Sequence, residues 1–279
     1  SLNATNTAFS VGATITAGEV GSAGGTAELL IDGASFSPTI TTAVSNTESS
    51  VTLASGTTTT AGLQSLFTAG SARVLTVKLT DSAGNATTSS GSGNTVSVLS
   101  DYTAPTVSTV TTSASGSKTT GASVAITVTL SEAVTTSASA TLTLETGTTD
   151  RDATCPAVTT STTLTCTYTV VSGDTASRLD YVATTSLATS GTVRDAAGNS
   201  ATLTLPATGG SGLYTANIIV DTTAPSAPTA TLTSTDSGTS GDRVTNVAPV
   251  LGVTAESGST VAVTATKDGS AFTLNTGLS

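Results

Sequence analysis

Apolar and hydroxyl-bearing residues alternate along much of the chain, a pattern typical of β-strands with one buried and one solvated face. The clearest run is residues 123–130, where Val, Ile and Leu occupy every second position. Residues 61–67 instead favour a single helical turn. Gly-, Ser- and Asn-rich stretches separate the strand-like runs and are expected to form turns. Strands are predicted at residues 12–16, 27–31, 50–53, 73–79, 95–99, 123–130, 140–144, 164–170, 191–194, 201–205, 229–233, 248–254, 259–266 and 271–274.

Two short motifs each occur twice and divide the chain. Asp-x-Thr-Ala-Pro begins at Asp101 and again at Asp221, and Asp-x-Ala-Gly-Asn begins at Asp81 and again at Asp195. The copies of each motif are separated by a domain-sized length of chain, which is typical of a tandem array. Short strands without a convincing amphipathic helix favour an all-β fold of tandem immunoglobulin-like β-sandwich modules. The modules are expected at residues 1–100, 106–220 and 226–279.

The third of these segments, residues 226–279, has room for only about half a sandwich. Two explanations stay open. The sequence is either cut from a longer chain, or a strand from a neighbouring chain completes the sandwich by β-augmentation. We interpret the sequence as a piece of a longer protein whose anchor lies elsewhere.

Composition narrows the range of functions. The chain is rich in Thr and Ser, and only 3% of its residues are aromatic and 9% charged. Its net charge of −10 and the lack of a basic patch argue against nucleic acid as a partner. No apolar run is long enough to insert into a membrane. Because the chain has no His, Ser-His-Asp and Cys-His triads are excluded, and we expect a protein that is not an enzyme.

The two cysteines, Cys155 and Cys166, flank a segment that reads as a hairpin. Cross-strand neighbours can meet the geometry of a disulfide, and an exported protein would allow the bond to form. The alternative is a pair of buried free thiols that act as small apolar side chains.

The middle module resembles the immunoglobulin-like repeats that occur in tandem along bacterial surface-layer proteins and very large adhesins. This resemblance implies a structural or adhesive role outside the cell, and it indicates no particular ligand. The cysteines stand where large apolar or aromatic strand residues are expected, which implies that a disulfide replaces some aromatic core. The stretches that carry the resemblance are residues 126–134, 141–151, 168–170, 172–175, 179–181, 193–203 and 219–225.

Acidic residues are expected to gather where one module joins the next. In an immunoglobulin-like sandwich, the loop between the second and third strands and the last hairpin share the pole where the chain enters. That pole would bring together Asp101, Glu132 and the turn from Asp195 to Asn199. Carboxylates this close repel one another unless a cation lies among them, and Ca²⁺ prefers such hard oxygen ligands. Calcium is therefore a candidate cofactor of this seam.

The same reasoning applies to the second seam. Asp221 would meet Glu256 there, with Asp236 or Asp242 as further ligands. The alternative at both seams is turn chemistry alone, in which the aspartates hydrogen-bond to nearby backbone amides.

From these observations we expect a cell-surface structural protein that forms a rod, lattice or filament. Its partners would be neighbouring modules or further copies of itself. The competing hypothesis is an adhesin module whose loops recognise a glycan or a host protein. That hypothesis predicts aromatic side chains exposed at loop tips.

Overall fold

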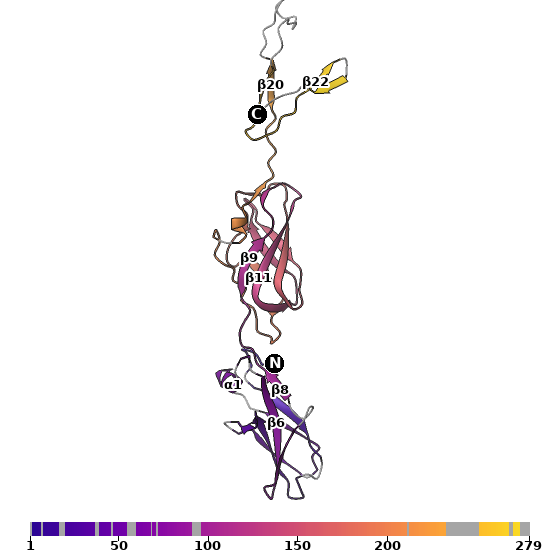
Figure 1. Ribbon diagram of the computed structural model, residues 1–279, viewed down its shortest axis with the longest axis vertical. Coiled ribbons are helices and arrows are strands. Elements are labelled where there is room, and N and C mark those ends of the chain that lie inside the picture. The colour runs from indigo at the N-terminus through magenta and orange to yellow at the C-terminus, as the bar shows by residue number, and fades with distance from the viewer. Residues whose placement is uncertain are drawn as a thin grey trace, which may run out of the picture. The chain divides into compact units, whose positions relative to one another are not determined.

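The computed structural model describes residues 2–6, 8–16, 20–36, 39–45, 47–54, 60–67, 69–70, 72–90, 96–210, 212–232, 251–267 and 270–273. The chain divides into two compact units, Ser1–Asp221 and Thr222–Ser279. Nearly all regular structure in both units is β-strand, arranged mainly in antiparallel sheets (Figure 1). The predicted all-β fold is therefore confirmed.

As far as the structure describes it, the N-terminal part of the first unit contains two sheets and one short helix. The two-stranded sheet pairs β1 with β5, and the larger sheet has the order β3-β2-β6-β7, with β4 also on β2 and β8 also on β6. Its core includes an aromatic trio of Phe9, Phe36 and Phe67, with ring centroids 5.2–6.4 Å apart. The elements are β1 (Ser10–Thr14), β2 (Gly25–Ile31), β3 (Ala34–Ser35), β4 (Thr41–Val44), β5 (Ser50–Ala54), α1 (Thr60–Leu66), β6 (Ala72–Asp81), β7 (Ala86–Thr88) and β8 (Val96–Leu99).

The C-terminal part of the first unit has a second, separate core. Its largest sheet has the order β16-β12-β13-β14-β11-β18, and a three-stranded sheet has the order β10-β19-β15. The elements are β9 (Val107–Thr112), β10 (Gly116–Lys118), β11 (Ser123–Thr136), β12 (Ala140–Glu145), β13 (Arg151–Cys155), β14 (Ser161–Thr169), β15 (Thr175–Ala176), β16 (Asp180–Tyr181), β17 (Leu187–Thr189), β18 (Val193–Arg194), the 3-10 turn η1 (Tyr214–Ala216) and β19 (Ile218–Asp221).

Strand β11 follows the predicted alternation and then continues past it. Its apolar residues Val124, Ile126 and Val128 are fully buried. The register with β14 shifts between Thr129 and Val134, so the strand bends and goes on to Thr136. The bend places the following residues at the pole where the chain enters from the first core.

The strand predicted at residues 201–205 does not form. Only a single parallel bridge, from Thr202 to Thr106, is present there. The Thr202 amide donates to the Pro105 carbonyl, and the Leu205 amide donates to the Thr184 carbonyl. Because its hydrogen bonds go to different segments, this stretch cannot join a continuous ladder despite its alternating sequence.

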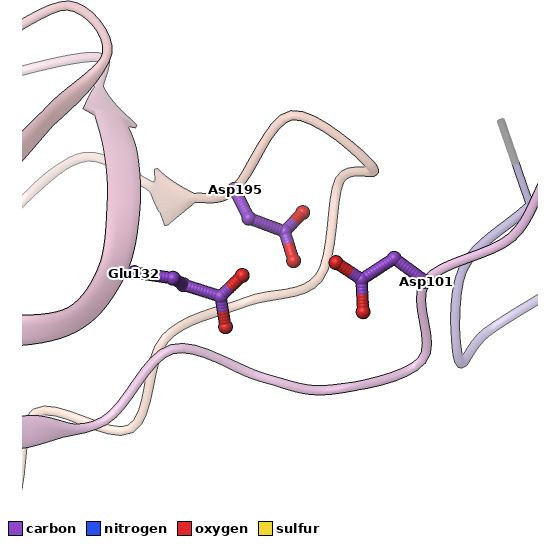
Figure 2. Close-up of side chains that lie close together, drawn as sticks. All are labelled: Asp101, Glu132 and Asp195. Carbon is purple, nitrogen blue, oxygen red and sulfur yellow. The ribbon is translucent and has the colours of Figure 1, made fainter. Parts of the chain in front are cut away.

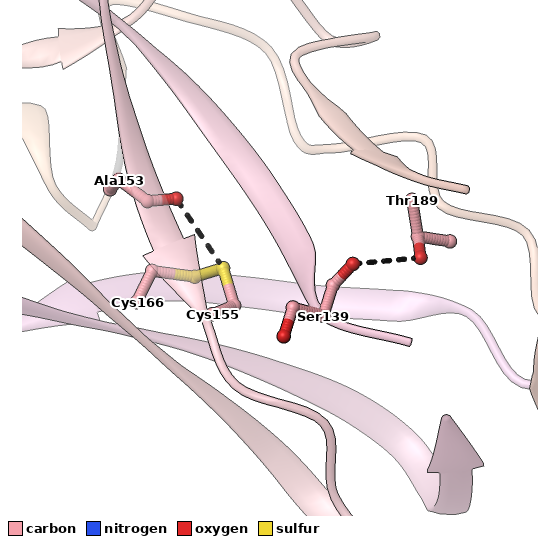
Figure 3. The surroundings of a disulfide bond; sticks show 5 residues. All are labelled: Ser139, Ala153, Cys155, Cys166 and Thr189. Carbon is pink, nitrogen blue, oxygen red and sulfur yellow. Dashed lines mark hydrogen bonds between the residues drawn. A yellow bond between two sulfur atoms is a disulfide. The ribbon is translucent and has the colours of Figure 1, made fainter. Parts of the chain in front are cut away.

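The two cysteines are joined by a disulfide (Figure 3). Strands β13 and β14 are antiparallel and pair Thr154 with Thr167, which places Cys155 directly opposite Cys166. Both cysteines are completely buried in the second core. The bond closes the hairpin from inside the second core.

A buried ionic network lies beside this hairpin. Asp174 is 1% exposed, and it accepts hydrogen bonds from Arg151 Nε at 2.8 Å, Tyr168 Oη at 2.8 Å and the Val171 amide at 2.9 Å. Burial alone would raise the pKa of Asp174, but these three donors outweigh burial and lower it from its ordinary value of 3.8. Tyr168, itself 1% exposed, therefore satisfies its hydroxyl within the core.

In the described residues of the second unit, the strands form two separate antiparallel pairs. Its elements are β20 (Thr229–Leu232), β21 (Leu251–Thr254), β22 (Thr264–Lys267) and β23 (Ser270–Thr273). The strand predicted at residues 259–266 is wrong over 259–263. Ser259 instead closes a turn, because both its amide and its hydroxyl donate to the Glu256 carbonyl.

We expect Asp174→Asn to lower the free energy of unfolding by about 2–3 kcal/mol at neutral pH, because Arg151 and two hydrogen-bond donors lose their anionic partner. The folded-state pKa of Asp174 is depressed, so its contribution is present above the unfolded pKa and disappears as pH falls through the folded value. Urea unfolding at pH 7 and near pH 3 measures both effects.

Asp152→Asn is the matched control, since Asp152 lies on the same strand as Arg151 and accepts one side-chain hydrogen bond, from the Thr143 hydroxyl. Asp152→Asn should lower the free energy of unfolding by less than about 0.5 kcal/mol. Equal losses in the two variants would show that the buried network contributes nothing specific.

Candidate metal centre

The segment that joins the two cores of the first unit is held on both sides. The Asp101 amide donates to the Leu2 carbonyl at 3.0 Å, and Tyr102 packs against the first core. Further along, the Thr106 amide donates to Ser131 Oγ at 3.0 Å, and the Ser131 amide donates back to the Thr106 carbonyl. The seam, residues 101–106, is therefore tied to the first core at its start and to the second core at its end.

A tight turn of the second core meets this seam. It follows β18 and runs from Asp195 to Asn199, and Asp195 Oδ1 accepts hydrogen bonds from the Gly198 and Asn199 amides at 2.6 and 2.8 Å. Gly198 has a φ of 97°, which favours glycine at this position. The Asp-x-Ala-Gly-Asn sequence therefore folds its own acidic side chain back onto the turn.

The Asn199 side chain links this turn to the first core. It is 3% exposed, and its amide nitrogen donates to the Asp101 carbonyl at 2.8 Å and to Asp195 Oδ2 at 2.7 Å. Its oxygen accepts from the Ala4 amide at 2.9 Å. Asn3 adds a hydrogen bond from its side-chain nitrogen to the Ala197 carbonyl at 3.1 Å. Three of these hydrogen bonds join the turn to the seam or to the first core, and the fourth, to Asp195, lies within the turn. Together they leave no polar atom of the Asn199 side chain unused.

Three carboxylates meet beside this joint (Figure 2). Asp101 comes from the seam, Glu132 from β11 at its bend, and Asp195 from the turn. One carboxylate oxygen of each lies within 4.8 Å of the others, and all three residues are partly buried or buried. Figure 2 shows their carboxylate groups pointing toward one another. The structure therefore brings together the three acidic residues predicted for the first seam.

The electrostatics of this cluster are unfavourable without a cation. Burial raises the pKa of Glu132 above its ordinary value of 4.5, and the negative charges of Asp101 and Asp195 raise it further. Asp195 is partly compensated by the turn amides, and Asp101 Oδ1 accepts from the Thr103 amide at 3.0 Å. Within the described part of the chain, Glu132 has no such donor.

The donor set fits a hard divalent cation. A Ca²⁺ ion binds oxygen at about 2.3–2.6 Å, so two of its ligands lie no more than about 5 Å apart. The spacing of the three carboxylates meets that limit. Asn199 was also predicted as a ligand; its oxygen accepts a hydrogen bond from the Ala4 amide and so links the turn to the first core, and its role as a ligand stays a prediction.

The carboxylates predicted for the second seam are only partly covered by the described residues. Asp236 and Asp242 lie outside the described residues. Asp221 ends β19 in the first unit, whereas Glu256 belongs to the second unit and accepts a hydrogen bond from the Ser226 amide at 2.9 Å. The calcium ligands suggested for this seam stay a prediction.

Several residues important to the joint could not be anticipated from sequence. Ala4 contributes only a backbone amide, and it lies 195 positions from its partner Asn199. Asn3 lies outside both repeated motifs. The one available signal was the repeated Asp-x-Ala-Gly-Asn turn, which marked where such a contact could occur but not what it would touch.

Comparisons with other proteins add no further evidence on function. No protein family, no curated protein and no solved structure was found to match this chain. Among the described helices, none is long and apolar enough to cross a membrane.

We expect Glu132→Gln to stabilise the protein slightly at neutral pH when divalent cations are chelated, by less than about 1 kcal/mol. The raised pKa of Glu132 makes its charged form a cost to the folded state above that pKa. The cost disappears as pH falls and the carboxyl becomes protonated. The gain should therefore shrink toward zero below pH 4.5. Thermal unfolding in a chelator across this pH range checks it; a lower midpoint for the variant at pH 7 would contradict the repulsion.

Proposed function

We propose that this chain is a non-enzymatic, extracellular structural protein of tandem immunoglobulin-like β-sandwiches whose modules are joined by stiffened seams. The observation that carries this proposal is the Asn199 side chain, which belongs to one core and hydrogen-bonds to the backbone of the other. A joint made this way opposes rotation about the seam. In a tandem protein, length then comes from repetition and direction comes from fixed joints.

Calcium is proposed to complete the first seam. Asp101 approaches from the seam itself, while Glu132 and Asp195 approach from the second core. A Ca²⁺ ion bound by all three would neutralise their mutual repulsion and add a link between the cores, beside the hydrogen bonds of Asn199. Backbone carbonyls and water would supply the remaining ligands.

The disulfide supports an extracellular location. Disulfides form and persist in oxidising compartments and are rare in the cytosol. The acidic, hydroxyl-rich composition also suits a surface that stays soluble outside the cell. The expected partners are neighbouring modules or further copies of the chain, arranged as a surface layer, a filament or an adhesin stalk.

The alternative, a glycan-binding or host-binding module, has less support. It predicts exposed aromatic rings, yet Phe36, Phe67, Tyr168 and Tyr181 are buried. The other aromatic side chains that the structure describes are all partly buried, and the Tyr214 ring lies under Arg178 at 5.1 Å. This distribution favours packing over sugar stacking.

The joint can be tested by comparing Asn199→Ala with Asn85→Ala. Asn85 occupies the same place in the turn that begins at Asp81 and makes the same internal bond to the aspartate, but it is exposed and its side-chain hydrogen bond stays within its own turn. Both variants should lose the turn contribution. Only Asn199→Ala should also lose the two bonds to the first core, costing about 1–2 kcal/mol more.

The decisive readout is small-angle scattering or the distance between labels placed in the two cores. Asn199→Ala should broaden the distribution of inter-core distances, and Asn85→Ala should leave it unchanged. A wild-type distribution as broad as that of Asn199→Ala would contradict a stiff joint.

Calcium should raise the unfolding midpoint of the wild-type chain, with stabilisation of about 2.7 kcal/mol at a concentration one hundred times the dissociation constant. Glu132→Gln should lose most of this response. Glu145→Gln, which changes an exposed carboxylate outside the cluster, should retain it. If all three proteins respond equally, the cation binds elsewhere.

A further inference from the structure

Tension on the second core would enter and leave at its two opposite ends. The seam leads into β9 at Thr106, beside the bend of β11. The chain leaves the first unit through β19, which ends at Asp221. Figure 1 shows the chain enter the second core at one end and leave it at the other. A pull on the two flanking segments is therefore directed along the strands of this core.

Two strand pairs hold the segment that receives the pull from the seam. Strand β9 pairs antiparallel with β11. Strand β10 follows after a short connection and pairs in parallel with β19, with Ser117 opposite Ile219. If β9 is stripped from β11, the pull passes along the chain to β10. The pairing of β10 with β19 is then the direct connection between the incoming and the outgoing chain.

The register of this pair shows which backbone groups join the two strands. The Leu179 amide donates to the Ile218 carbonyl, so the backbone groups of Ile218 face β15. Those of Ile219 face β10, because successive residues of a strand point their backbone groups to opposite sides. A parallel ladder with Ser117 opposite Ile219 bonds Ile219 to the two neighbours of Ser117. The register thus places the Lys118 amide on the Ile219 carbonyl, whereas the backbone groups of Ser117 point away from β19.

The direction of the pull decides how these hydrogen bonds are loaded. Strands β10 and β19 run the same way, so tension draws β10 back toward the seam and β19 forward toward Asp221. The two strands are pulled past each other along their length, and the hydrogen bonds between them are loaded together. If both strands were pulled from the same end, the bonds would break one after another. Loading along the strands therefore requires several bonds to break in one step.

Buried side chains add to the resistance of β19. Ile218 is completely buried and Val220 is 2% exposed, and both belong to the second core. On its other edge, β19 pairs with β15 at Thr175 and Ala176. Movement of β19 past β10 therefore also draws two aliphatic side chains out of the core and breaks a second ladder.

The disulfide lies outside this load-bearing pair. It joins β13 to β14, and in the described structure neither strand pairs with β10 or β19. Cys155 and Cys166 are both completely buried while the core is folded. Once β10 and β19 separate and the core opens, the disulfide still holds residues 155–166 closed. That segment cannot extend until the disulfide is reduced.

We propose that the β10–β19 pair is a mechanical clamp, which keeps the second core folded while tension acts between the seam and Asp221. The clamp fixes the force at which the core opens, and the disulfide limits how far the opened core extends. The clamp rests on the proposed structural function only for the source of the tension. Its failure would leave the stiff joint at Asn199 untouched, because the joint is measured without force.

Single-molecule force spectroscopy tests the clamp on the full chain, held at its two ends in a chelator so that seam calcium plays no part. The disulfide identifies the opening of the second core. With a soluble thiol reductant present, a further extension of about 35 Å should follow that opening, because a span of 11 residues is released. This extension should not precede opening, since the buried disulfide is then out of reach of the reductant.

Variants of β10 locate the hydrogen bonds that resist the pull. Lys118→Pro removes an amide that faces β19, and it should raise the rate of opening at a fixed force at least about tenfold. Ser117→Pro is the matched control, because it removes an amide of the same strand that faces away from β19, and it should leave the rate nearly unchanged. Lys118→Ala keeps the amide and accounts for the loss of the side chain, whose ammonium donates to the Ser115 carbonyl.

The direction of loading tests the clamp without altering its strands. Thr106→Cys combined with Thr222→Cys anchors the pull at opposite ends of the second core. Thr119→Cys combined with Thr222→Cys anchors it at one end, just beyond β10 and β19. The second arrangement should separate the two strands at a several-fold lower force, because their hydrogen bonds then break in succession.

Three results would overturn the clamp. The first is an equal rate of opening for Lys118→Pro and Ser117→Pro, and the second is a reductant-dependent extension that precedes opening. The third is an equal opening force for the two directions of loading. Faster opening confined to Lys118→Pro, together with a lower force when both anchors lie at one end, supports the clamp. If Lys118→Pro does not fold, the two directions of loading decide alone.

Discussion

The joint at the seam depends on the buried side chain of Asn199, in which every polar atom makes a hydrogen bond. A buried amide that loses a hydrogen bond keeps the full cost of leaving water, so all the partners of Asn199 must be in place together. Two of those partners are backbone groups of the first core or the seam, and one is Asp195. The contact that fixes the joint therefore also fixes where Asp195 lies, and it holds that carboxylate near Asp101 against their repulsion.

The acidic residues of this chain are stabilised in different ways, because few Lys and Arg side chains are present to pair with them. Eighteen acidic residues face only eight Lys and Arg. Asp174, which is buried in the second core, forms an ion pair with Arg151. Asp81 and Asp195 are each stabilised by backbone amides and the asparagine of their own turn, and the hydrogen bond from the Asn85 side chain is the main reason that the pKa of Asp81 is lowered. Within the described residues, Glu132 has neither an arginine partner nor a hydrogen bond from a turn amide. The cluster around it therefore suits an added cation.

The parts of this structure that could be predicted from sequence are those set by local pattern. Alternation located β11 and β14, the strand that carries Cys166, because a strand with one buried face has apolar residues at every second position. The strand that carries Cys155, β13, was not among the predicted strands. The same alternation failed at residues 201–205, where hydrogen bonds to separate segments prevent a ladder. The carboxylate cluster could be predicted from the general layout of a sandwich. The role of Asn199 could not, because its partner at Ala4 is a backbone amide that any residue except proline would supply.

That dependence on backbone has a consequence for how such a chain can change over generations. The socket that receives Asn199 consists of the Ala4 amide and the Asp101 carbonyl, so it makes little demand on the side chains of the first sandwich. A module that carries the Asp-x-Ala-Gly-Asn turn could be duplicated, deleted or exchanged and still find a compatible neighbour. In the tandem array that we propose, a joint of this type would let the number of modules change without matched mutations on both sides.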